Sequence, residues 1–297
     1  MNNILEVNNL TMSFKKFKAL KNVSFKISNH NQVIGLIGPN GAGKTTLINT
    51  ILGQLKPTKG DIWANQEDIA FCPDVPIFEP YLTPIEVIQQ TLELNGKKSR
   101  KYNPEIHTIL ESVGLKRYKN KLVGQFSRGM KQRLGIASSL VLEPKIIFLD
   151  EPTSALDPFG QRDILNLVRT ISKDRIVIIS SHNLSDIEKI AENLIVLSQG
   201  TLIYQGPVNE FVQNDKEYVY LTLSENENIE EVKAVFKNND IKYNLTSDMN
   251  FQLKSSELQK IFLLLSKYPN IMKKIERDSL DLDEAFEKRV KQLIDSV

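Results

Sequence analysis

The chain has 297 residues, of which 41% are hydrophobic and 25% are charged, and its formal net charge is +2. This composition is typical of a globular protein with one large domain or two smaller ones, and the small net charge gives no electrostatic reason to expect nucleic acid as a partner. The apolar runs are too short for a membrane span, and the N-terminal residues lack the pattern of a signal peptide. A single cysteine, Cys72, cannot form an internal disulfide. We therefore expect a cytoplasmic chain that reaches a membrane only through a partner.

Apolar and polar residues alternate near the N-terminus, in residues 5–10 and 23–27. Alternation with a period of two predicts strands of a partly exposed antiparallel sheet. Phe14 and Phe17 lie between these strands in a basic, turn-like stretch.

A glycine-rich turn follows, between a short apolar run at residues 33–37 and an apolar-periodic segment at residues 47–52. A glycine-rich turn between a strand and a helix is the context in which such a turn binds phosphate. The glycines let backbone amides point inward, and the helix adds its free amides and positive end. We expect the lysine of the turn to reach the β- and γ-phosphates and the threonine after it to bind Mg²⁺. The predicted nucleotide contacts are Gly38, Asn40, Gly41, Gly43, Lys44, Thr45 and Thr46.

An aromatic ring just before such a pocket can stack on the adenine base. Phe14 and Phe17 are the rings in that position, and the alternative is that either one only packs on the small sheet.

Short strands are predicted next at residues 61–64 and 69–71, followed by a proline-rich surface loop. From residue 84 to about residue 142 the apolar spacing is helical, which predicts an inserted helical subdomain. Within it Ser127 can cap a long helix, so that free amides at Gly129 and Met130 would form a second anion-binding terminus. The alternative is an ordinary capped helix.

Buried strands are predicted at residues 145–150, 175–180 and 194–197, with helical stretches between them. This alternation predicts a doubly wound parallel sheet with its ligand at the carboxyl ends of the strands. Asp150 ends the first of these strands and can hold Mg²⁺, and Glu151 can polarise the attacking water. His182 follows the second strand and is a candidate contact for the γ-phosphate.

A third region begins near residue 215 and contains strand-like residues 218–223 and 251–253, helix-like residues 229–236 and 258–265, and a charged amphipathic tail at 282–294. It predicts a small α+β appendage, and its residues carry no recognisable chemistry.

In this order the motifs resemble those of the ATP-binding subunit of ABC transporters, over roughly residues 3–212. Residues 38–45 resemble the Walker A loop, 126–130 the signature motif, and 146–150 Walker B. By this resemblance Glu151 is the catalytic glutamate, His182 the switch histidine and Phe14 the adenine-stacking aromatic residue. Asp157 ends a stretch similar to the D-loop, and Asp74 stands at the glutamine-loop position, where it would contact Mg²⁺ and nucleotide.

The resemblance implies an α/β fold, a P-loop NTPase RecA-like core with an antiparallel β subdomain and an inserted helical subdomain. The ATP-binding domain would span residues 1–214, its helical subdomain about 84–142, and the C-terminal α+β accessory domain 215–297. It also implies a homodimer that buries two ATP molecules with Mg²⁺, each between Lys44 of one chain and Ser127 and Gly129 of the other. A membrane-spanning permease would be the partner, holding the chain at the inner face of the cell membrane.

Two positions depart from the family pattern. Asp74 replaces the usual glutamine or glutamate, and its shorter side chain puts direct binding of Mg²⁺ in doubt. Arg128 replaces the first glycine of the signature motif. Its side chain either points away from phosphate or adds positive charge near the nucleotide of the partner chain.

The form of the signature motif and the C-terminal appendage are most similar to bacterial exporters of the bacitracin-resistance and sodium-extrusion group. The main alternative is a soluble ABC-type ATPase acting on ribosomes or nucleic acid. Such proteins usually carry two nucleotide domains or long coiled-coil insertions, which this chain lacks. A protein that binds ATP and hydrolyses it poorly is a third reading, which the presence of both Glu151 and His182 argues against.

Overall fold

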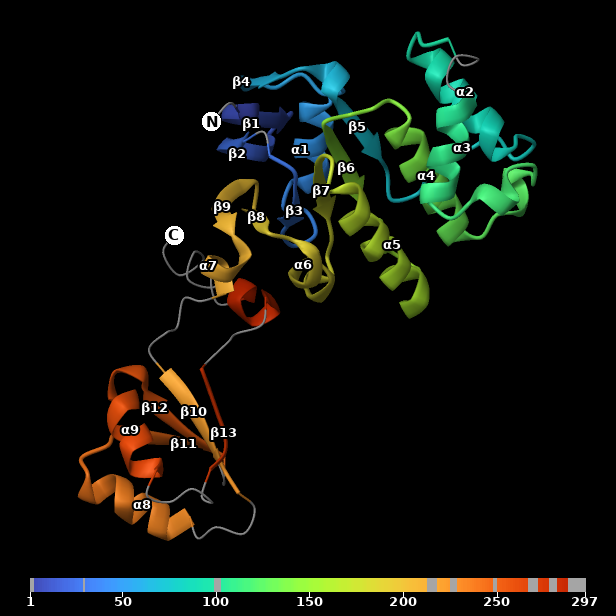
Figure 1. Ribbon diagram of the computed structural model, residues 1–297. Coiled ribbons are helices and arrows are strands. Elements are labelled where there is room, and N and C mark those ends of the chain that lie inside the picture. The colour runs from blue at the N-terminus through green and yellow to red at the C-terminus, as the bar shows by residue number, and fades with distance from the viewer. Residues whose placement is uncertain are drawn as a thin grey trace. The chain divides into compact units, whose positions relative to one another are not determined.

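The computed structural model describes residues 3–28, 30–98, 103–212, 218–224, 229–247, 250–266, 272–277 and 282–287. The chain forms two compact units, residues 1–208 and 209–297 (Figure 1). The domain boundary expected at residue 214 falls within residues 213–217, outside the described part of the chain. No helix formed by the described residues is long and apolar enough to cross a membrane.

The N-terminal strands form a three-stranded antiparallel sheet in the order β2-β1-β4. Its strands are β1 (Asn3–Phe14), β2 (Phe17–Ser28) and β4 (Lys59–Ala64). Alternate residues of β1 and β2 are buried, as the alternating sequence predicts, so one face of the sheet packs on the protein and the other faces solvent. Trp63 lies on the exposed side of β4, opposite Glu6, with 60% of its surface accessible.

The larger sheet has six strands in the order β5-β6-β7-β3-β8-β9. The first five of these are parallel and correspond to predicted strands: β5 (Ile69–Cys72), β6 (Ile146–Asp150), β7 (Ile176–Ser180), β3 (Gln32–Ile37) and β8 (Asn193–Ser198). β9 (Thr201–Pro207) was not predicted and pairs antiparallel with β8, so the sheet is mixed rather than wholly parallel. Its residues are exposed or half-buried, so they lack the apolar run that marks the buried strands.

Helix α1 (Lys44–Ile51) lies between the two sheets (Figure 1). The buried residues of β1 and β2, the apolar side chains of α1, and alternate residues of the parallel strands form one hydrophobic core. Because α1 begins at Lys44, this core fixes the position of the glycine-rich turn that precedes it.

Two helices, α5 (Pro158–Ile171) and α6 (Leu184–Ile190), lie on the side of the parallel sheet away from α1 (Figure 1). The helical subdomain contains α2 (Pro84–Leu94), α3 (Asn103–Ser112) and α4 (Arg128–Leu140), which pack against one another. Helix α2 starts with a capping box in which Thr83 and Glu86 satisfy each other's backbone amides.

The second unit contains an antiparallel sheet in the order β11-β12-β10-β13. In chain order, after α7 (Val208–Val212), come β10 (Tyr218–Leu223), α8 (Ile229–Asn238), β11 (Tyr243–Ser247), β12 (Asn250–Lys254), α9 (Leu258–Leu265) and β13 (Met272–Arg277). This β-α-β-β-α-β order with the first strand between the third and fourth is the ferredoxin-like arrangement. β13 was not predicted, and of the predicted tail helix only residues 282–287 are described, as a helix.

The second unit has its own core, centred on Phe236 of α8. The Phe236 ring lies edge-on to Phe251 at 5.3 Å and 5.7 Å from Tyr243, measured between ring centroids, and is fully buried. A small unit with one core depends strongly on such a residue.

Replacing Phe236 with alanine is expected to destabilise the second unit by about 3–5 kcal/mol, because the cavity adds to the lost burial. Urea unfolding followed by circular dichroism would measure the loss. Nucleotide binding, a property of the first unit, should not change. The matched control is Phe262→Ala on α9, whose ring is 51% exposed and whose loss should cost no more than about 0.5 kcal/mol. Equal losses in the two variants would contradict this assignment of the core.

Candidate nucleotide site

The glycine-rich turn connects β3, in which every residue is buried, to α1. Two of its glycines are required by close contacts. A Cβ atom on Gly38 would lie 2.3 Å from the carbonyl oxygen of Leu197, and one on Gly43 would lie 2.7 Å from that of Ala19. Gly43 also has a φ of 103° as the residue that caps α1, a conformation that favours glycine. These close contacts with Leu197 and Ala19 therefore constrain the shape of the turn.

Lys44 is 9% exposed, and its ammonium group lies within the turn. It donates hydrogen bonds to the carbonyl oxygens of Gly38 at 2.6 Å and Pro39 at 3.3 Å. Burial lowers the pKa of Lys44, and the carboxylates of Glu151 and Asp150 act in the opposite direction. A phosphate group would replace the two carbonyl oxygens as the partner of this buried cation.

The other predicted residues of the turn lie around Lys44. Asn40, Gly41 and Thr45 are exposed, and Thr46 is half-buried. Phe14 ends β1 opposite Phe17, and both rings project into solvent, with 45% and 64% of their surfaces exposed. Phe14 is thus partly accessible to a ligand. Its contact with adenine stays a prediction.

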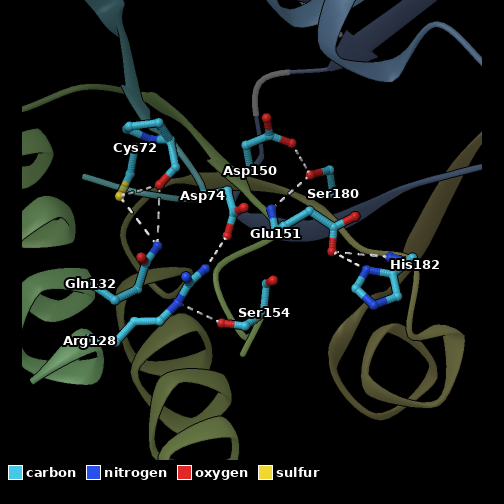
Figure 2. A network of polar contacts seen from close by, with 10 residues as sticks. Cys72, Asp74, Arg128, Gln132, Asp150, Glu151, Ser154, Ser180 and His182 are labelled. Carbon is cyan, nitrogen blue, oxygen red and sulfur yellow. Dashed lines mark hydrogen bonds and ion pairs between the residues drawn. The ribbon is translucent and has the colours of Figure 1, made fainter. Parts of the chain in front are cut away.

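Asp150 ends β6 and Glu151 follows it, and their positions depend on Ser180 of the neighbouring strand β7. Asp150 is paired with Ser180 across the sheet, and Ser180 with Leu36 of β3, so three strands end at the same level. The Ser180 hydroxyl donates to Asp150 Oδ1 and accepts a hydrogen bond from the Glu151 amide at 2.9 Å (Figure 2). Ser180 was not predicted as a site residue, although a polar residue at the end of a buried strand is a signal that could have identified it.

His182 lies next to Glu151, as Figure 2 shows. Its Nδ1 atom is 2.6 Å from Glu151 Oε2, and its backbone amide donates to the same oxygen at 3.3 Å. Glu151 itself has a φ of 46°, in the left-handed region that non-glycine residues rarely adopt. The two predicted catalytic residues are therefore in direct contact.

Two of the predicted contact residues cap helices. Ser127 accepts a hydrogen bond from the Met130 amide at 3.3 Å at the start of α4, and Asp157 accepts one from the Gly160 amide at 2.7 Å at the start of α5. The cap on α4 was predicted. The expectation that the Met130 amide is free was wrong, because Ser127 already binds it. Ser127 is exposed and Gly129 is half-exposed, so both can reach a second molecule.

Asp74 and Arg128, the two departures from the family pattern, bind each other (Figure 2). Arg128 Nη2 lies 2.7 Å from Asp74 Oδ1, and Arg128 Nε donates to the carbonyl oxygen of Ser154 at 3.0 Å. Arg128 is thus held by its own chain. The Asp74 oxygen that binds it is engaged and is not free for a metal ion.

The donor set at the carboxyl ends of β3 and β6 fits Mg²⁺. This ion takes oxygen ligands, and in nucleotide sites it is bound by one or two side chains together with the phosphates. Thr45 provides an exposed hydroxyl beside Lys44, and Asp150 a carboxylate with one oxygen turned to Ser180. Thr45 and Asp150 are therefore the residues that would hold the ion, and Asp74 has one of its two carboxylate oxygens bound to Arg128.

The site has a phosphate loop between a buried parallel strand and a helix, and this loop faces a carboxylate pair at the end of a nearby strand. These features define a P-loop nucleoside triphosphatase. The ABC transporter family matches residues 20–154 of the chain. The chain is 37% identical over 233 residues to the uncharacterized ABC transporter ATP-binding protein YxlF of Bacillus subtilis, covering 76% of this chain and 78% of that protein. It is 34% identical over 238 residues to the bacitracin transport ATP-binding protein BcrA of Bacillus licheniformis, covering 76% of each.

Among solved structures, cbiO1 from Clostridium perfringens, described as part of the ABC transporter complex cbiONQ, matches with a TM-score of 0.65 and 28% identity. The match covers 72% of this chain and 92% of that chain. The chain therefore belongs to the family of ABC transporter ATP-binding proteins. It is an ATPase subunit whose ATP hydrolysis is coupled to transport.

Cys72, the single cysteine, ends β5 behind this site and is fully buried. Its sulfur atom lies 3.7 Å from Nε2 of Gln132 on α4. Burial, with a smaller contribution from the negative charge of Asp150, raises the pKa of Cys72 to about 12.

The Cys72 thiol should therefore react with a thiol reagent at pH 8 about a thousandfold more slowly in the folded chain than in the urea-unfolded chain, since only the thiolate is a nucleophile. Because the raised pKa belongs to the folded state, its stabilising effect is present below the unfolded value of about 8.5 and is lost as the pH rises toward 12. Absorbance of the released thiol product would follow the reaction. Labelling of the folded chain at the unfolded rate would contradict the buried position.

Proposed function

We propose that this ATPase subunit works as a head-to-tail homodimer with two ATP molecules and Mg²⁺ at the interface, and that it powers export through a separate membrane-spanning permease. The observation that carries the hydrolytic part of the proposal is the contact between Glu151 and His182 at the same sheet edge as the buried Lys44. ATP hydrolysis requires a base, a residue that orients the base and a cation that binds phosphate, and Glu151, His182 and Lys44 are the residues proposed for these roles.

In the proposed reaction Lys44 leaves the carbonyl oxygens of Gly38 and Pro39 and binds the β- and γ-phosphates. Bound Mg²⁺ would neutralise charge on the phosphate oxygens. Glu151 accepts a proton from the water as the water oxygen bonds to the γ-phosphorus, and the bond from that phosphorus to the β–γ bridging oxygen breaks to release ADP and phosphate. His182 holds Oε2 of Glu151 through its amide and its ring, which leaves Oε1 to face the water.

The proposed dimer rests on the positions of the remaining predicted contacts. Ser127 caps α4 in the helical subdomain and is exposed, and Gly129 lies in the first turn of α4 and is half-exposed. A helix start with an exposed hydroxyl can bind an anion, so in a head-to-tail pair these residues would face the γ-phosphate held by Lys44 of the other chain. Asp157 would lie beside them in the D-loop.

Exposed apolar residues in the loop before α2 and in the helical subdomain support docking of a permease. Val75, Ile77 and Tyr81 have 53%, 90% and 67% of their surfaces exposed, and Leu122 has 43%. Backbone hydrogen bonds from Val123 to Leu82 and from Gly124 to Pro80 hold the segments of Tyr81 and Leu122 together. Large exposed apolar patches are typical of protein interaction sites. We call residues 75, 77, 81 and 122 the docking surface.

The export direction rests on similarity. A relative of 34% identity is named as a bacitracin transport ATP-binding protein, and the signature motif and C-terminal appendage resemble those of exporters. In the proposed arrangement the chain lies at the inner face of the cell membrane, held there by the permease.

Glu151→Gln should lower the rate of ATP hydrolysis at least about 100-fold, because the amide cannot accept the proton. ATP binding should persist and trap a dimer, which size-exclusion chromatography with ATP would detect. Lys44→Ala is the matched control. It should weaken ATP binding itself, measured by calorimetry, by at least about tenfold, since a charged hydrogen-bond donor is lost. Hydrolysis by Glu151→Gln at the parent rate would exclude Glu151 as the base.

Affinity purification of the tagged chain from detergent-solubilised membranes of its own host should recover a polytopic membrane protein in stoichiometric amount. Ile77→Glu should lower that recovery at least about tenfold, because a charge would be placed in an apolar contact. Trp63→Glu, an exposed aromatic on β4 outside the docking surface, should not change it. Recovery with ribosomal or nucleic-acid-binding proteins instead would favour the soluble ABC-type ATPase.

A further inference from the structure

Arg128 joins three segments that are far apart in the sequence. It begins α4, directly after Ser127. Its guanidinium binds Asp74, in the loop after β5, and the carbonyl oxygen of Ser154, in the loop after Glu151. The planar fork of arginine suits such a double contact, because Nε and Nη2 donate in different directions from one rigid group.

The three segments have different tasks in the proposed function. The segment of Asp74 leads directly into Val75 and Ile77 of the docking surface. The start of α4 carries Ser127 and Gly129, which would face the nucleotide of the other chain. Ser154 belongs to the loop that leads from the catalytic Glu151 to Asp157. A group that binds all three fixes their relative positions.

The pair is suited to movement rather than to stabilisation. The side chains of Arg128 and Asp74 are 39% and 40% exposed, and exposed ion pairs contribute little to the free energy of unfolding. The carbonyl contact to Ser154 is a single hydrogen bond. The connection can therefore be broken and remade without unfolding the site.

We propose that Arg128 is a positioning residue which, through Asp74 and Ser154, couples the docking surface to the two loops that face ATP. The two departures from the family pattern then form a matched pair, in which an arginine at the signature motif takes a carboxylate at the glutamine-loop position as its partner. The inference rests on the proposed function. It concerns how the loops are held and not which residue is the base.

A double-mutant cycle tests the pair. The variants are Asp74→Asn, Arg128→Met and the double substitution, in the full-length chain. Each single substitution should lower kcat about tenfold with KM and the dissociation constant of ATP within about twofold of the parent, because misplacement of catalytic loops affects the reaction more than binding. The double variant should be no worse than the more affected single variant. Thermal unfolding would verify that each variant folds.

The chain offers a matched control on the same helix. Arg133 of α4 binds Asp163 of α5 with the same separation, 2.7 Å between Nη2 and Oδ2, and its other nitrogen donates to the carbonyl oxygen of Val113. This pair touches none of the three segments. Asp163→Asn should leave kcat unchanged, whatever it does to the melting temperature.

Losses that multiply to about a hundredfold in the double variant would show that Asp74 and Arg128 act independently and would overturn the proposal. Unchanged kcat in Arg128→Met would also overturn it, as would an equal loss in Asp163→Asn. These outcomes differ from a failure of the proposed function. In that case the parent chain would not hydrolyse ATP, or Glu151→Gln would hydrolyse it at the parent rate.

Discussion

Parallel pairing of β3 and β6 with β7 between them is the constraint on which the site depends. Because Leu36, Ser180 and Asp150 are paired across these strands, the loops after them begin at one edge of the sheet. The middle strand also contributes the hydroxyl that orients the carboxylate of its neighbour. The position of the Asp150 carboxylate is thus determined by the buried sheet, and the exposed loops contribute the remaining residues of the site. An error of one residue in the register would separate Asp150 from Ser180 and turn the side chains of the strand to the opposite face.

The second constraint is electrostatic. Lys44 is a cation removed from water, and its only compensation within the turn comes from carbonyl dipoles. The carboxylates of Glu151 and Asp150 also favour its charged form. A triphosphate brings the full negative charge that these groups supply in part, so the turn already offers the polarity that the nucleotide needs. Preorganisation of this kind reduces the cost of ordering the loop when the nucleotide binds.

Local sequence context was sufficient for much of the fold and for the residues of the turn, since glycine spacing, buried apolar runs and polar strand ends are signals within a few positions. It was insufficient for β9 and β13. β9 has no fully buried residue, and β13, with the sequence MKKIER, is charged along most of its length at a sheet edge. The bond between Arg128 and Asp74 spans 54 positions, and neither residue predicts the other without the fold. Whether the Arg128 side chain points away from phosphate or toward it could therefore not be predicted from the sequence, because its partner is brought close only by the tertiary structure.

Trp63 gives the chain an uncommon optical property. It is the sole tryptophan, and it lies on the exposed side of β4 in the small antiparallel sheet. All indole emission therefore originates in the sheet that also carries Phe14. The second unit contains tyrosines and phenylalanines but no indole ring. Intrinsic tryptophan fluorescence will consequently report on the surroundings of the small sheet, and no indole ring of the second unit contributes to it.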